Sequence, residues 1–314
     1  MIARPDIDAL MAGELGLWLQ QQAVVREEAR AVSNGRLVKS AVVVLPLAAF
    51  LLFGPDWSGQ LKMWLIGLAC AGAGFWIYAP RGAAIKQTKE GINAALAAAL
   101  GLSYANETGP SLGFGRAKTF RMVPNYDRES FEDLWSGEVG DRAFALHEAN
   151  LQQRRQSGKT TTYVTVFRGP IMTIACDRQF HGTTLVERSG KHKRFGLFGE
   201  KDEVELGDHN LAKVDMVHPG FEDEFTIYST DQVEARYLVH PVYVEKLVAL
   251  EAAFAGQKIR TLFHEGELTV VLETADMFES GGMDATRDRW MVKQCVGQFM
   301  AMVELAGTLN EPGR

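Results

Sequence analysis

The chain has 314 residues, of which 46% are hydrophobic and 23% are charged, and its formal net charge is −6. That length supports one or two domains with a sizeable core. The mild acidity argues against nucleic acid as a partner, because phosphate binding needs a concentrated basic surface. The three cysteines (Cys70, Cys176 and Cys295) lie far apart without a CxxC pair, which predicts reduced thiols in a cytosolic setting rather than a disulfide framework.

The first 36 residues are expected to form a cytoplasmic helix. Apolar side chains recur near a 3.6-residue period over residues 6–33, and Asp6 or Asp8 could cap the start. Two interpretations stay open for this helix. It lies along a membrane surface, or it packs against a soluble part of the chain.

Residues 37–80 predict a transmembrane helical hairpin. The stretches LVKSAVVVLPLAAFLLFG (37–54) and LKMWLIGLACAGAGFWIYAP (61–80) carry no charge after Lys39 and Lys62. Each offers about 18 residues, which at ~1.5 Å per residue span roughly 27 Å, enough for a bilayer core. The residues ahead of the first stretch, and the second stretch close behind it, disfavour a cleaved signal peptide.

Basic residues flank the hairpin on both outer sides, with Arg26, Arg30 and Arg36 before it and Arg81 and Lys86 after it. This bias places both termini in the cytoplasm of a protein that spans the membrane twice. The second span also has a small-residue face made by Gly67, Ala71 and Gly74. Such a face favours close helix contact, either with the first span or with another helix through self-association or a membrane-protein partner.

Two segments are expected to connect the hairpin to a cytoplasmic domain. Residues 81–104 contain strong helix formers, and they predict a helical stalk that continues the second span. Residues 105–117 are rich in glycine and turn residues, which is typical of a linker.

Residues 118–314 predict an α+β domain with a largely antiparallel sheet and packed helices. TTTYVTVFRG (160–169) and IMTIACD (171–177) read as two strands separated by a Gly-Pro break. IRTLF and ELTVVLE flank His264-Glu265-Gly266 and predict a hairpin. Helices are expected from Pro241 and from Asp288. Strands and helices do not alternate regularly, which favours α+β over α/β.

The stretch FTIYSTDQVEARYLVHP (225–241) gathers polar groups in a pattern that suits two interpretations. Ser229 to Gln232 offers a capping box, and His240-Pro241 ends an element, so caps and turns explain the pattern. The rival is an enzyme acting on a membrane-proximal substrate. Its site would use Asp231, Glu234, Arg236, Tyr237 or His240.

The same stretch carries a family resemblance, together with FEDLWSGEVGDRAFALHEANL (131–151) and VFRGPI (166–171). With these segments the chain resembles an uncharacterised bacterial family, domain of unknown function 3137. The resemblance implies a two-span bacterial membrane protein, which we expect in the inner membrane. It implies no activity, no cofactor and no functional residues.

RSGKHKRFGLFGEK (188–201) is the surface segment that most suggests binding. A cluster of basic residues precedes an aromatic tip between glycines, which fits contact with anionic lipid headgroups, although an acidic partner and a solvated hairpin tip remain alternatives. The candidate lipid- or partner-binding residues are Arg188, Lys191, Lys193, Arg194, Phe195 and Phe198.

The sequence indicates no cofactor and no metal site. The seven histidines form no HxH, HExxH or Cys/His cluster, and no GxSxG, P-loop or dinucleotide fingerprint occurs. A Cys176/His181 dyad is outweighed by a structural cysteine. We therefore expect a non-enzymatic binding or scaffolding module of the membrane, with an accessory subunit or assembly factor of a membrane complex as a variant of this function.

Overall fold

The computed structural model describes residues 4–54, 56–158, 160–177, 180–192, 200–215, 224–274 and 280–308. Within these residues the chain forms two compact units. We call residues 6–93 together with 280–293 the hairpin unit. The rest, from Ala94 through the sheet and from Gln294 to the end of the last helix, is the sheet unit.

The hairpin unit begins with two helices, α1 (Ile7–Ala12) and α2 (Glu14–Phe53). Asp6 caps α1 by accepting hydrogen bonds from the N–H groups of Asp8 and Ala9. The helix expected over 6–33 is therefore interrupted at Gly13, whose extended backbone separates α1 from α2. Beyond that point α2 continues into the first apolar stretch, because no residue between the two segments stops a helix.

The helix α3 (Gly59–Ala99) carries both the second apolar stretch and the expected stalk. The stalk ends earlier than residue 104. Gly101 adopts a φ of 72°, which suits glycine, and a strand begins at Leu102. The hairpin unit is completed by the short helix η1 (Ala285–Arg287) and the first turns of α8 (Asp288–Thr308).

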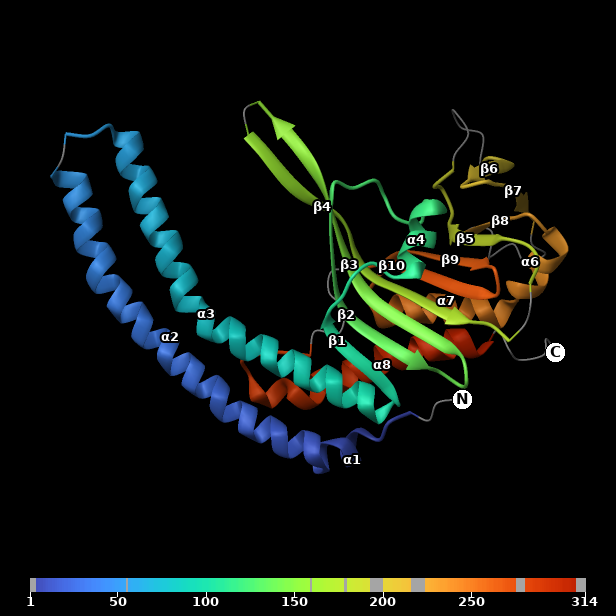
Figure 1. Ribbon diagram of the computed structural model, residues 1–314, viewed down its shortest axis with the longest axis horizontal. Coiled ribbons are helices and arrows are strands. Elements are labelled where there is room, and N and C mark those ends of the chain that lie inside the picture. The colour runs from blue at the N-terminus through green and yellow to red at the C-terminus, as the bar shows by residue number, and fades with distance from the viewer. Residues whose placement is uncertain are drawn as a thin grey trace. The chain divides into compact units, whose positions relative to one another are not determined.

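The sheet unit contains an antiparallel sheet that, in the described part of the chain, has ten strands in the order β1-β2-β3-β4-β10-β9-β5-β8-β7-β6 (Figure 1). All its pairings are antiparallel, which confirms the expected α+β class. The strands are β1 (Leu102–Glu107), β2 (Arg128–Glu138), β3 (Ala143–Ser157), β4 (Thr160–Ala175), β5 (Thr184–Arg188), β6 (Glu203–Leu206), β7 (His209–Val214), β8 (Phe225–Ser229), β9 (Gln257–His264) and β10 (Glu267–Glu273).

Two local expectations meet different outcomes in this sheet. The hairpin around Gly266 is confirmed, because β9 and β10 pair on either side of a turn in which Glu265 and Gly266 have φ of 52° and 74°. The break at Gly169-Pro170 is wrong, since β4 runs through both residues. Gly169 has a φ of 149°, and a Cβ there would lie 2.0 Å from the Leu272 carbonyl oxygen, so glycine permits a close approach of backbones.

The expected linker over 105–117 instead contains the end of β1 and most of a helix, α4 (Leu112–Thr119). Ser111 caps α4, its hydroxyl oxygen accepting a hydrogen bond from the Phe114 N–H at 3.2 Å. Phe114 is buried in the core. The glycines of this segment thus lie in a helix that tertiary packing stabilises, against their low intrinsic propensity.

Helices cover both faces of the sheet. On one face α4 packs over an apolar cluster that includes Phe114, Leu151, Ile171 and Leu262. On the other face lie α7 (Pro241–Ala253) and the C-terminal part of α8. There the Trp135 ring stacks on Phe299 at 5.7 Å between centroids. The small helix α6 (Gln232–Leu238) connects β8 to α7.

Candidate membrane anchor and binding surfaces

The helices α2 and α3 carry their apolar side chains on the outside. Each is long and apolar enough to cross a membrane, with windows of mean hydropathy 2.0 and 1.4. Only 11% and 0% of these windows are buried in the protein, whereas a core helix of a soluble protein would be mostly covered. Val43, Phe50 and Trp64 are 65%, 63% and 72% exposed. The hairpin is thus compatible with contact to a lipid bilayer.

Polar contacts tie the two helices together at one end of these apolar windows. The Ser33 hydroxyl donates to the Ile77 carbonyl at 2.8 Å, and an Arg36 guanidinium N–H donates to the Trp76 carbonyl at 2.7 Å. The same guanidinium lies 5.0 Å from the centre of the Trp76 ring. A basic group and an aromatic ring at this level are typical of a membrane–water interface.

Gly67, Ala71 and Gly74 lie on the exposed face of α3 rather than against α2. A Cβ added at Gly67 or at Gly74 would meet no atom within 4 Å. Gly67 and Ala71 also line an open groove of about 560 Å³, with Trp64 and Leu68 beside them. The sequence allowed this face to contact either the first span or another helix. In the structure the face does not contact α2 and is available to another helix, and contact with such a helix stays a prediction.

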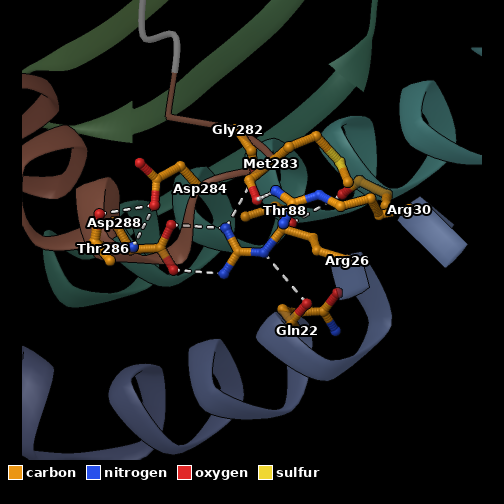
Figure 2. A network of polar contacts seen from close by, with 10 residues as sticks. Gln22, Arg26, Arg30, Thr88, Gly282, Met283, Asp284, Thr286 and Asp288 are labelled. Carbon is orange, nitrogen blue, oxygen red and sulfur yellow. Dashed lines mark hydrogen bonds and ion pairs between the residues drawn. The ribbon is translucent and has the colours of Figure 1, made fainter. Parts of the chain in front are cut away.

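A buried ion pair fastens the C-terminal strap, which we define as residues 280–290, to α2 within the hairpin unit (Figure 2). The Arg26 guanidinium donates to both carboxylate oxygens of Asp288, at 2.7 and 2.6 Å. It also donates to the Gly282 carbonyl at 3.0 Å and to the Gln22 carbonyl at 3.2 Å. The two charged side chains are 1% and 5% exposed. A bidentate pair of this kind is strong and geometrically specific.

Further contacts extend the strap to α3. The Ser280 hydroxyl donates to the Asn93 side-chain oxygen at 2.9 Å. A Cβ at Gly281 would lie 2.5 Å from the Ile85 carbonyl oxygen, so the strap backbone lies directly on α3. Together with the ion pair in Figure 2, these contacts join α2, α3 and the strap, which are far apart in the sequence. The ion pair has no local signature, because Arg26 and Asp288 are 262 positions apart.

Four of the five residues that could have formed a catalytic site make structural contacts at the turns into α6 and α7. Asp231 caps α6, accepting from the Val233 and Glu234 N–H groups at 2.9 and 3.0 Å. Glu234 accepts from the Gly182 N–H at 2.7 Å, and Arg236 donates to a backbone carbonyl at 3.1 Å. His240 caps α7, and Tyr237 is partly exposed.

The capping box expected from Ser229 is wrong in one respect: the cap of α6 is Asp231. The Ser229 hydroxyl instead accepts from the Asp231 N–H at 3.0 Å and donates to the Asp231 carbonyl at 2.9 Å. Serine therefore closes the turn before the helix, and the carboxylate satisfies the free N–H groups of its first turn.

The structure describes two of the six candidate residues of the basic loop. Arg188 forms an ion pair with Glu224 at 2.7 Å, forms another with Glu251, and lies 4.3 Å from the centre of the Phe225 ring. Burial acts to lower its pKa, but hydrogen bonds to the two carboxylates outweigh burial and raise the pKa. Lys193, Arg194, Phe195 and Phe198 lie outside the described residues.

Lys191 belongs to a second buried cluster, around Glu187. The Glu187 carboxylate is almost completely buried on β5, and it pairs with the Lys191 ammonium at 2.8 Å and with His192 Nε2 at 2.7 Å. Burial acts to raise the pKa of Glu187, but the His192 hydrogen bond and the Lys191 charge together hold it below its usual value. Lys191 therefore neutralises an internal carboxylate, and lipid or partner contact by the loop stays a prediction.

Cys176 and His147 are buried groups with shifted pKa values. Burial raises the pKa of the Cys176 thiol to about 11, so this cysteine lacks the thiolate that a nucleophilic dyad would need. His147, on β3, has no exposed surface, its ring lies 5.5 Å from that of Phe131, and burial lowers its pKa to about 4. Among the described residues, no group of three or more His, Cys, Asp or Glu side chains could hold a metal ion.

Comparison with known proteins gives one family and one distant structural likeness. Residues 165–311 match the family model described as protein of unknown function, DUF3137. No curated protein matches the chain. The crystal structure of the mycobacterial trehalose monomycolate transport factor A, TtfA, is similar with a TM-score of 0.33 and 11% identity, over 69% of this chain and 95% of that chain. A likeness at this level establishes neither a shared fold nor a shared function.

Proposed function

We propose that this protein is a binding or scaffolding module that the hairpin unit holds at a membrane. The proposal comes from the geometry of the chain, because residues 165–311 match a family model that is itself of unknown function. The observation that carries this proposal is the exposure of the apolar windows in α2 and α3. Exposed apolar surface on this scale marks contact with a membrane or with another protein, and the length of both windows favours the membrane.

The basic residues outside the two spans support an orientation. Arg26, Arg30 and Arg36 precede the first window, and Arg81 and Lys86 follow the second. With positive charge kept on the cytoplasmic side, both termini and the sheet unit lie in the cytoplasm of a bacterium, at its inner membrane. In this orientation Ser58, between the helices, faces the outside, so a Ser58→Cys variant reacts with a membrane-impermeant maleimide added to spheroplasts. Failure to react in intact spheroplasts, with reaction after lysis, would reverse the orientation.

The polar strap supports a scaffolding function. Arg26 and Asp288 bind the strap to α2 next to the first window, and α8 continues from the strap into the sheet unit. The sheet unit is therefore connected to the hairpin unit at two points in the sequence, within α3 and within α8. A double attachment suits an accessory subunit or assembly factor that presents a binding domain close to a membrane complex.

Charged substitutions on the exposed faces of the hairpin test the membrane anchor. In the double variant Val43→Arg/Phe50→Arg, each arginine costs about 2.5–3.5 kcal/mol of insertion free energy at the centre of a membrane helix. The matched control, Val24→Arg, places the same charge at an exposed position of α2 (59% exposed) outside the apolar stretch. We expect the double variant to be released from membranes by alkaline carbonate, while wild type and the control stay bound. Equal retention of all three proteins would contradict the anchor.

A further inference from the structure

The outer halves of β3 and β4 leave the sheet as a two-stranded ribbon, from Gln152 to Thr165 (Figure 1). Pairing between the two strands continues to Ser157 and Thr160 at the tip. On its other side, β4 pairs with β10 only over Ile171–Ala175, followed by one hydrogen bond from the Thr274 N–H to the Arg168 carbonyl at 2.9 Å. In the described part of the chain, β4 between Thr160 and Phe167 therefore has one paired edge and one open edge.

The hydrogen-bond pattern identifies the backbone groups on the open edge. The Gln152 carbonyl accepts from the Asp127 N–H at 2.8 Å, and the Arg154 N–H donates to the Asp127 carboxylate at 2.6 Å. The backbone polar groups of Gln152 and Arg154 thus turn away from β4. In an antiparallel pair, the opposite residues then turn theirs away as well. Those residues are Thr165 and Tyr163, and Thr161 follows by the two-residue period.

A groove lies at the foot of this open edge. It has a volume of about 360 Å³, and its lining includes Thr165 and Phe167 of β4 with Gln257, Glu273 and Thr274 from the ends of β9 and β10. The groove is the place where the open edge of β4 meets the paired part of the sheet. A segment that followed the open edge would have room for a side chain where the pairing with β10 begins.

The charge of the ribbon indicates which kind of segment would pair with the open edge of β4. Between Ala149 and Cys176 the sequence has four basic residues, Arg154, Arg155, Lys159 and Arg168, and no acidic residue. Arg168 is engaged by Glu148 and Glu132 inside the sheet unit, but Arg154 and Arg155 are exposed. Both arginines lie on β3, one strand away from the open edge, so a second copy of this ribbon would bring two regions of the same positive sign near each other, with no acidic residue between Ala149 and Cys176 to offset them. Charge complementarity therefore favours an acidic occupant.

We propose that the open edge of β4 binds an extended acidic segment of a partner protein as an added strand. Backbone hydrogen bonds to Thr161, Tyr163 and Thr165 give affinity, and the basic residues of the ribbon give the preference for acidic side chains. Long unpaired edges invite such pairing. This inference names a partner class for the proposed binding function and rests on it, but it does not depend on the membrane anchor.

A peptide-binding measurement on the full chain in detergent micelles tests the added strand. The probes are two fluorescent octapeptides, one with alternating Glu and Val and one with alternating Lys and Val. Thr161→Pro removes one N–H donor from the open edge, and its matched control, Thr161→Val, keeps the donor. Arg154→Gln/Arg155→Gln removes two charges. Thermal unfolding of each variant verifies that the sheet unit is intact.

We expect the acidic peptide to bind at least tenfold more tightly than the basic one. Thr161→Pro should weaken binding at least tenfold, Thr161→Val should not, and Arg154→Gln/Arg155→Gln should weaken it and flatten its salt dependence. Equal binding of both peptides, or unchanged binding by Thr161→Pro, would overturn the proposal. Self-association that Thr161→Pro abolishes would also overturn it, in favour of a second copy. Membrane retention in carbonate is measured on the same variants, so a failure of the ribbon is distinguishable from a failure of the anchor.

Discussion

The two units of this protein differ in where their large apolar side chains lie. The hairpin unit exposes apolar side chains such as Val43 and Phe50 and buries an ion pair between Arg26 and Asp288. The sheet unit also buries charged groups, such as Glu187, but it buries its apolar side chains around Phe114 and Phe299 as well. A fold that buries apolar groups suits water, whereas helices that expose them suit lipid. The proposed membrane anchor accounts for this difference, and the following predictions test it.

The largest effect is expected where the hairpin unit buries charge. Asp288→Asn leaves the Arg26 guanidinium buried without its counterion, which costs about 3–5 kcal/mol of unfolding free energy. The measurement is thermal unfolding of the full chain in micelles. Arg289→Gln serves as the control, because its pair with Asp8 is exposed, and exposed pairs contribute about 0–1 kcal/mol. Arg26→Met/Asp288→Leu should regain much of the loss, since apolar groups of similar size often replace a buried pair without cost. Equal effects of Asp288→Asn and Arg289→Gln would show that the strap does not hold the unit.

A second effect concerns the sheet unit, which buries a neutral histidine. Burial lowers the pKa of His147 from its ordinary value of 6.5 to about 4 in the folded protein. Between these values the unfolded chain binds more protons, so stability falls as the pH drops from 6.5 to 4. The loss is on the order of 3 kcal/mol. His147→Leu should remove this part of the acid sensitivity, measured as the difference between the two pH–stability curves. Parallel curves would mean that His147 is solvated or paired in solution.

Sequence patterns predicted the elements that depend on neighbouring residues. The two apolar windows, the turn at Gly266 and the helix starting at Pro241 follow from runs, turn residues and proline placement. The capping function of Asp231 was also within reach, because a carboxylate before a helix satisfies its first N–H groups. These features are local, so a single sequence contains their cause.

The remaining features depend on partners far away in the chain. β4 continues through Gly169, where the absence of a Cβ allows the backbone of Leu272 to approach closely. α4 forms because Phe114 packs into the core of the sheet unit. The buried face of α2 includes Gln22 and Arg26 rather than an apolar stripe, because Asp288 supplies the counterion. Polar residues on a helix read as solvated in a sequence. Only the fold shows that this face is covered. Likewise, only the fold shows that one edge of β4 is left open.

A smaller effect is expected on the exposed small-residue face of α3. If another membrane helix packs there, Gly67→Leu/Gly74→Leu should weaken its association, because the larger side chains would hold the two backbones apart. Gly72→Leu is the matched control, since Gly72 is also exposed but lies off that face. Energy transfer between labelled copies in lipid vesicles measures self-association, and copurification with a complex measures association with a partner. If all three glycine substitutions act alike, the groove beside Gly67 is an ordinary lipid-facing surface.

The smallest effect is expected in the basic loop (188–201), which is the part of the sheet unit expected to contact lipid headgroups. Lys191 is already committed to Glu187, so Lys191→Ala should lower stability rather than lipid contact. Lys193→Ala/Arg194→Ala removes two charges outside the described residues, each contributing about 1 kcal/mol near anionic lipid. In the background of Val43→Arg/Phe50→Arg, where the hairpin no longer dominates binding, we expect weaker flotation with anionic vesicles and no change with neutral ones. If flotation is unchanged with both kinds of vesicle, the basic loop does not contact lipid. The sheet unit would then be surrounded by water, and lipid contact would be confined to the hairpin unit.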